Sequence, residues 1–246
     1  MFKHIYSTSL IIFLFSIASL AQIPDHFVNL KVLSSDISKD ELVSVMRSFS
    51  SGLGVRCNFC HVEGEGQGLG SMNFVSDEKD NKKKARIMME MVHDLNTKYL
   101  PELSEFSKDI IKVKCVTCHR GATEPQSLED VLFEVVKSKG LPEAISTYHQ
   151  LHDRYYGGFA YDFRDHSLVS LSEMLSDSSM FDAALAFDSL NINMYPESGT
   201  AYFGLAEAYE KKGDKENAIK YYQKSIELNP RSADFINRRI EALKNE

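Results

Sequence analysis

The sequence predicts a mainly α-helical protein, and three patterns in its 246 residues support this fold class. Apolar residues recur at helical spacing over residues 38–49 and 80–100. Each of these segments is followed by one copy of a short cysteine and histidine pattern. A spacing of 34 residues relates segments of the C-terminal half, as in stacked helical hairpins. We therefore expect four regions: an export signal at residues 1–21, a short N-terminal segment at 22–34, a domain with both cysteine patterns at 35–124, and a repeat domain at 125–246.

The N-terminus is typical of an export signal. Lys3 precedes the apolar stretch 10–18, and small residues up to Ala21 form a cleavage site before Gln22. The apolar stretch is shorter than the roughly 20 residues needed to span a bilayer, which favours cleavage over an uncleaved anchor. We therefore expect a soluble periplasmic or otherwise exported protein, with no integral membrane span after cleavage.

The charge argues against nucleic-acid binding. The formal net charge is -7, whereas neutralising phosphates requires a clustered basic surface. The basic run Lys82–Lys84 is flanked by acidic residues, so it is interpreted as a solvated helix face. No nucleic-acid partner is expected.

Two helices are predicted before the two cysteine patterns. The first begins at a capping box from Ser38 to Glu41 and runs to about Phe49, after which Gly52 and Gly54 turn the chain back. The second runs from about Asp80 to Leu100 and is stopped by Pro101. Its apolar stripe consists of Ala85, Met88, Met89, Val92, Leu95 and Tyr99.

The cysteines predict the cofactor. All four lie in two copies of one pattern, Cys57–His61 and Cys115–His119, in which a histidine follows the second cysteine directly. Two thiols three residues apart can form thioethers to the two vinyl groups of a porphyrin, and the next imidazole then reaches the iron. Zinc sites, disulfides and redox dithiols need no such histidine. The patterns therefore predict two covalently bound haem c groups, with attachment at Cys57, Cys60, Cys115 and Cys118 and proximal iron ligation by His61 and His119.

The second axial ligand of each iron is expected to be a methionine on the preceding helix. Met46 lies on the first helix, and the turn after it would bring its thioether over the haem face opposite His61. Met88 lies on the apolar stripe of the second helix. Met91 and His93 on that helix are rivals, and ligation by His93 would lower the reduction potential.

The C-terminal half has the features of a repeat scaffold. Residues 199–230 resemble a tetratricopeptide repeat, residues 168–196 form a weaker copy, and residues 128–154 a third. Residues 232–244 are expected to be a closing helix. Such a stack can bind a partner peptide or protein, or can serve only as a spacer. The aromatic segment 155–161 is either a contact patch or packing between repeats, and packing is favoured.

The stretch from about Asp40 to Ala122 resembles the cytochrome subunit of bacterial photosynthetic reaction centres. The resemblance rests on Leu53–Val62, Ser76–Lys79, Ala85–Val92, Leu95–Asn96, Tyr99–Leu100 and Val116–Gly121. It implies a helix, turn and attachment motif for each haem, and a distal helix methionine. That role falls on Met46 by its distance from the motif and on Met88 by its place in the Arg-x-Met-x-Glu-Met pattern. Those photosynthetic subunits carry four haems, whereas this chain has two motifs.

The expected function is electron transfer by an exported di-haem c-type cytochrome that is not an enzyme. Its partners would be redox proteins and a peptide or protein ligand on the repeat surface. Two alternatives stay open: a haem enzyme with an open iron site, such as a peroxidase or reductase, and a redox-sensing scaffold in which the repeats carry the function.

Overall fold

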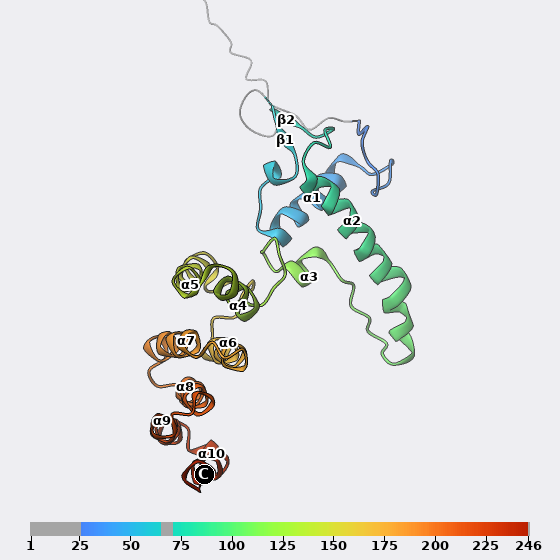
Figure 1. Ribbon diagram of the computed structural model, residues 1–246. Coiled ribbons are helices and arrows are strands. Elements are labelled where there is room, and N and C mark those ends of the chain that lie inside the picture. Colours follow the sequence, from blue (N-terminus) through green and yellow to red (C-terminus); the bar gives the residue numbers. More distant parts are fainter. Residues whose placement is uncertain (1–25, 65–70, 246) are drawn as a thin grey trace, which may run out of the picture. The chain divides into compact units, whose positions relative to one another are not determined.

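A computed structural model describes residues 26–64 and 71–245 (Figure 1). The expected export signal and its cleavage site lie outside the described residues. The chain divides into two compact units. The N-terminal unit holds Met1–Ser50 and Arg56–Val113, and the C-terminal unit holds Ser51–Val55 and Lys114–Glu246. The unit that contains the repeats therefore also contains the second cysteine motif.

The N-terminal unit is built from two helices and a small hairpin. Helix α1 spans Lys39–Leu53 and α2 spans Asp80–Asp94. Between them lie a 3-10 turn η1, Cys57–Phe59, and the strands β1, Val62–Glu63, and β2, Met72–Asn73. The strands pair antiparallel, with Val62 opposite Asn73 and Glu63 opposite Met72.

The predicted capping box of α1 is confirmed. The Glu41 backbone N–H donates to the Ser38 hydroxyl at 3.3 Å, and the Ser38 N–H donates to the Glu41 carboxylate at 3.1 Å. These two bonds satisfy donors that the first turn of a helix leaves free. The hydrogen bond from Ser38 also lowers the pKa of the Glu41 carboxyl.

The second helix ends differently from the prediction. Regular α-helix stops at Asp94 and continues as a π-helical turn η3, Leu95–Tyr99, and then as a 3-10 segment η4, Leu100–Glu105. Pro101 lies within the first turn of η4, where a missing backbone N–H removes no helical hydrogen bond. The sequence had suggested that Pro101 stops the helix, but helical turns continue past it to Glu105.

The C-terminal unit begins with the short helix α3, Cys115–His119, and continues as a stack of helical hairpins (Figure 1). Consecutive helices pack as pairs, and α6 also packs against α4 and α8. The bounds are α4 Leu128–Lys139, α5 Leu141–Tyr155, α6 Asp165–Asp177, α7 Phe181–Met194, α8 Gly199–Lys212, α9 Lys215–Leu228, η5 Pro230–Ser232 and α10 Ala233–Asn245. The three predicted hairpins and the closing helix are all present.

Two clusters of hydrophobic side chains fill the repeat stack. One cluster, around Leu132, Tyr148, Leu171 and Phe187, spans α4 to α7 and reaches Ala208 of α8. A second cluster, around Tyr222 and Ile240, joins α8, α9 and α10. Each hairpin therefore buries its apolar face against its neighbours, as expected for stacked repeats.

No helix in the described ranges 26–64 and 71–245 is long and apolar enough to cross a membrane.

Candidate haem sites

The first cysteine motif forms a single helical turn. The backbone N–H groups of Cys60 and His61 both donate to the Cys57 carbonyl, at 3.2 and 3.0 Å. Cys57 and Cys60 are free thiols with half-buried side chains, and burial raises the pKa of Cys60. The turn therefore holds two unpaired thiols and the adjacent imidazole on one short segment, as covalent haem attachment requires.

His61 lies in an environment that keeps its imidazole neutral. Its ring packs edge-on against Phe74 with centroids 5.0 Å apart. Burial, together with the charges of Lys82, Lys79 and Arg86, lowers the pKa of His61 to about 4. Its Nδ1 atom is buried and has no hydrogen-bond partner among the described residues. A neutral imidazole is the form that ligates a metal, so these surroundings suit an axial iron ligand.

The start of α2 clamps the first motif. The Asn81 side-chain amide donates to the Phe59 carbonyl at 3.2 Å, and the Lys79 ammonium donates to the Asn58 carbonyl. Neither contact could be predicted from the sequence, because a lysine or an asparagine at a helix start carries no specific signal for it. They fix the carbonyl side of the turn that carries the two thiols.

The interpretation of Lys82 as part of a solvated helix face is wrong. Its side chain is buried, forms an ion pair with Asp77 at 3.0 Å and donates to the carbonyls of Phe74 and Ser76 at 2.8 Å each. Asp77 also pairs with Arg86 at 2.9 Å, and the bonds from its cationic partners hold its pKa far below the ordinary value. The run of lysines therefore contains one buried structural cation, which the sequence could not distinguish from its neighbours.

The second cysteine motif forms α3 in the C-terminal unit. Its histidine, His119, is buried, and its Nδ1 lies 3.0 Å from the Ala122 carbonyl. A proton on Nδ1 that is donated to this carbonyl leaves Nε2 with a free lone pair, which is the usual arrangement of a metal-bound histidine. Cys115 and Cys118 are free thiols, half-buried and exposed respectively. The second motif thus has the tautomer and the unpaired thiols that haem attachment needs.

The methionines predicted as distal ligands lie on the helices expected for them. Met46 is half-buried on α1 in the same compact unit as the first motif, and Met88 is half-buried on α2. The rivals Met91 and His93 are both exposed on α2. Ligation of the irons by any of them stays a prediction.

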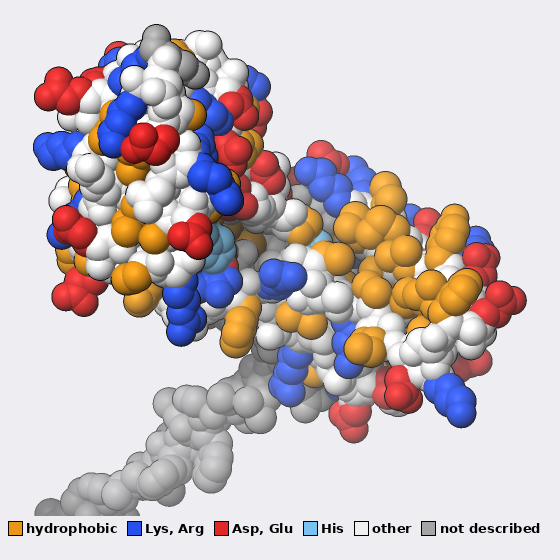
Figure 2. All heavy atoms as spheres, turned by 90° about the horizontal axis from the view of Figure 1, so that it is seen from below, with side chains coloured by type: hydrophobic (Ala, Val, Ile, Leu, Met, Phe, Trp, Pro, Cys, Tyr) orange, Lys and Arg blue, Asp and Glu red, His pale blue; other side chains and the backbone are white. Residues whose placement is uncertain are grey.

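The described side chains of the N-terminal unit form almost no hydrophobic core of their own. Of the hydrophobic side chains that the structure describes in this unit, only Leu42 is buried. Figure 2 shows hydrophobic side chains gathered over the face formed by α2 and the segment after it. The exposed ones in this unit are Val28, Val75, Ile87, Met91, Tyr99, Leu103, Phe106 and Ile111. A soluble unit rarely exposes so much apolar surface without a partner, so these residues fit a unit folded around large porphyrins.

Asn96 ties the chain before the second motif to the end of α2. Its side-chain amide donates to the Val113 carbonyl at 2.8 Å and accepts from the Val113 N–H at 2.8 Å. It also donates to the Val92 carbonyl at 2.9 Å. Val113 lies two residues before Cys115, so this clip holds the entry to the second motif. No sequence pattern predicted this clip, and the π-helical turn that contains Asn96 is visible only in the structure.

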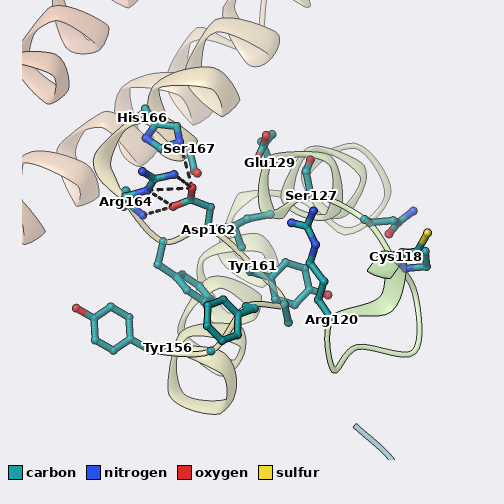
Figure 3. A pocket seen from close by; sticks show the side chains of 18 of the residues that line it. Cys118, Arg120, Ser127, Glu129, Tyr156, Tyr161, Asp162, Arg164, His166 and Ser167 are labelled. Atoms are coloured by element: carbon teal, nitrogen blue, oxygen red, sulfur yellow. Dashed lines mark hydrogen bonds and ion pairs between the residues drawn. The ribbon is translucent and has the colours of Figure 1, made fainter. Parts of the chain in front are cut away.

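A cavity of about 970 Å³ lies in the C-terminal unit beside Cys118 (Figure 3). Arg120 and residues 156–163, which overlap the aromatic segment 155–161, line it. Asp162 and Arg164 pair at its wall, with Nε 2.9 and 3.0 Å from the two carboxylate oxygens, and this contact lowers the pKa of Asp162 to about 2. The predicted packing role holds for part of the aromatic segment only.

Within that segment the aromatic rings divide into two groups. Tyr155 and Tyr161 pack against the repeat core with their rings 5.2 Å apart. Tyr156 and Phe159 are exposed, Phe159 to 85%. The exposed pair leaves room for a contact patch next to the second motif.

Comparison with known proteins gives two family matches. The model described as "Photosynthetic reaction centre cytochrome C subunit" matches residues 19–145, and that described as "Tetratricopeptide repeat" matches residues 200–232. Cytochrome c-554 of Chloroflexus aurantiacus is 35% identical over 103 residues, which are 42% of this chain and 22% of that protein. The photosynthetic reaction center cytochrome c subunit of Rubrivivax gelatinosus is 30% identical over 100 residues, which are 37% of this chain and 26% of that protein.

These matches cover about a quarter of the length of the two curated relatives. The first family model, at residues 19–145, spans both cysteine motifs. The first family model covers more than half of the 246 residues. The chain belongs to the photosynthetic reaction centre cytochrome c subunit family, and it carries a tetratricopeptide repeat near its C-terminus.

Proposed function

We propose that this protein is an exported di-haem c-type cytochrome that transfers electrons between partner proteins. The observation that carries the proposal is the pair of cysteine motifs, each folded as one helical turn with unpaired thiols and a histidine suited to bind iron. Family membership supports covalently bound haem c as the cofactor. The exposed apolar side chains among the described residues of the N-terminal unit support it independently, because a porphyrin would bury this surface.

In this proposal Cys57 and Cys60 hold one haem and Cys115 and Cys118 hold the other. When bound, each haem supplies an iron that alternates between the ferrous and ferric states. Protein residues that fill both of its axial positions would keep that iron from reacting with other molecules. His61 and His119 would take the proximal positions, His61 as a neutral imidazole and His119 with its Nδ1 facing the Ala122 carbonyl.

The distal positions fall to Met46 and Met88 in this proposal. A thioether is a weaker donor to ferric iron than imidazole, so methionine ligation raises the reduction potential relative to two histidines. Met91 and His93 remain the rivals for the second haem. Both side chains are exposed, whereas Met88 is half-buried on the apolar stripe.

The first experiment is the intact mass and the absorption spectrum of the full chain, exported from a host that matures c-type cytochromes. We expect a mass that corresponds to cleavage before Gln22 plus two haems, and a thioether-to-iron charge-transfer band in the ferric spectrum. Replacing Cys57 and Cys60 together by alanine, or Cys115 and Cys118 together, should remove one haem each. A wild-type protein without covalent haem would reject the proposal.

The axial ligands are tested by single substitutions with a matched control. Met46→Leu and Met88→Leu should each weaken the charge-transfer band and lower the potential of one haem. Met89→Leu serves as the control, because Met89 is equally half-buried and next to Met88 on α2. An unchanged band in Met88→Leu, together with its loss in Met91→Leu, would transfer the ligand role to Met91.

Carbon monoxide binding to the reduced protein distinguishes an electron carrier from the alternative, a haem enzyme. A ferrous haem with both axial positions filled by protein side chains does not take up this ligand readily. Rapid binding to the wild-type protein at one haem would favour an open iron site and a catalytic role.

A further inference from the structure

Two helix ends meet in the C-terminal unit at an unusually close backbone contact. The Gly121 N–H, just after α3, donates to the Gly52 carbonyl in the last turn of α1 at 2.9 Å. The Gly121 carbonyl lies so close to Gly54 that a Cβ on Gly54 would be 2.0 Å from its oxygen. Gly52 packs on α3 itself, where a Cβ would be 3.1 Å from the Val116 nitrogen and 3.5 Å from the Cys115 Cβ. We call Gly52, Gly54 and Gly121 the glycine junction.

Helix termination alone does not account for this contact. Gly54 and Gly121 both have left-handed backbone conformations, with φ of +65° and +96°, which glycine adopts without strain. A helix end requires only that conformation. At Gly121 an added Cβ would meet no atom within 4 Å, whereas at Gly54 it would strike a backbone oxygen. Gly54 is therefore needed for the approach of two chain segments as well as for its own φ angle.

The glycine junction lies close to both haem-attachment motifs along the chain. Gly54 lies three residues before Cys57, and Gly121 lies two residues after His119. Three residues span at most about 11 Å when fully extended, so each motif begins or ends within a short tether of the same contact. The segment that enters the first motif is thus held against the turn that leaves the second.

We propose that the glycine junction tethers the segment that enters the first haem-attachment motif to the turn that leaves the second, and that this tether sets the coupling through which the two haems exchange electrons. This inference rests on the proposed di-haem function and adds the element that joins its two centres. Glycine has no side chain that could ligate iron, so we assign the junction residues a positioning role.

The test compares Gly54→Ala with Gly121→Ala in the full-length haem-loaded protein. Both substitutions place alanine at a left-handed position, but only Gly54→Ala adds a clash with the opposite backbone. Three quantities are measured for each: the haem count from the intact mass, the hydrogen-exchange rate of the residue-121 amide, and the magnetic interaction of the two ferric haems by electron paramagnetic resonance.

We expect the wild type to show magnetic interaction between its haems. Gly54→Ala should keep two haems, exchange the residue-121 amide about tenfold faster because its bond to Gly52 is lost, and show a weakened interaction. Gly121→Ala should retain the wild-type interaction. If Gly54→Ala does not accumulate, Gly52→Ala replaces it, since its Cβ meets α3 at 3.1 Å from within a regular helix; a weakened interaction is again expected.

The possible failures are distinguishable. A wild-type protein with fewer than two haems contradicts the proposed function and, with it, the junction's role. A wild-type protein with two haems but no magnetic interaction contradicts the junction's role alone. The same holds if the Gly54→Ala protein, or Gly52→Ala in its place, carries two haems with unchanged interaction.

Discussion

Replacing Asp188 by asparagine should stabilise the repeat stack at neutral and alkaline pH. Asp188 lies on α7 with its side chain fully buried, and the Ser172 hydroxyl donates to one carboxylate oxygen at 2.5 Å. The other oxygen has no hydrogen-bond partner among the described residues. Burial, with a smaller effect from Glu207, raises the pKa of Asp188 to about 8. The folded protein therefore holds this carboxyl in its neutral form at pH 7.

The sign and size of the effect follow from the two protonation states. An unfolded aspartate titrates near 3.8, so at pH 7 the unfolded chain has lost a proton that the folded chain keeps. The stability contributed by the neutral carboxyl is complete below pH 3.8 and falls as the pH rises towards 8. At about 1.4 kcal/mol per unit, the loss between pH 3.8 and pH 7 is at most about 4 kcal/mol. Asparagine has similar volume and does not ionise, so Asp188→Asn removes this loss.

The assay is urea unfolding followed by circular dichroism between pH 5 and pH 9. The wild type should lose stability as the pH rises across this range, and Asp188→Asn should lose less, which makes it the more stable protein at pH 8. Asp182→Asn is the control, because Asp182 lies on the same helix with a 94% exposed side chain. Equal pH slopes for wild type and Asp188→Asn would refute the reasoning.

Three further outcomes are expected. Asn96→Ala removes both hydrogen bonds to Val113 and should lower the unfolding free energy of the N-terminal unit by about 1–3 kcal/mol in urea titrations. Thr97→Ala, at an exposed position, should have little effect. Equal losses in the two variants would contradict the role of Asn96 as a clip. Acid should destabilise the same unit, because Asp77 has three cationic partners and a lowered pKa. The stability that the ionised Asp77 contributes is present above about pH 4 and is lost as the pH falls below it. A thermal unfolding temperature that does not change with acid pH would exclude this. Leu171→Ala, at a fully buried position, should cost about 2–5 kcal/mol in urea unfolding, and a loss below 1 kcal/mol would show that α6 does not anchor the stack.

Local patterns in the sequence were sufficient wherever the physics acts within a few residues. The capping box at Ser38 depends on atoms three residues apart, and the structure has both of its bonds. The repeat helices were predicted because apolar spacing within each hairpin determines which face is buried. The cysteine motifs were recognised because thioether attachment itself requires a fixed short spacing.

Prediction failed where a residue's role depends on a distant part of the chain. Lys82 has the same sequence character as Lys83, but only the fold places it next to Asp77 and the carbonyls of the preceding loop. The end of α2 was wrong for a related reason, since Asn96 binds Val113 across a loop and the helix widens there into a π turn. Pro101 had indicated the end of the helix, but the helical turns continue through it.

The sequence by itself determined the family, the helical class and the candidate haem ligands, because each of these follows from short spacings along one chain. Only the tertiary structure decided which charges are buried and which helix ends touch. The contact between Gly54 and Gly121 joins residues 67 positions apart in the printed sequence, and no local rule predicts it. Such contacts depend on how elements pack in three dimensions, where burial and close approach are determined by the whole unit.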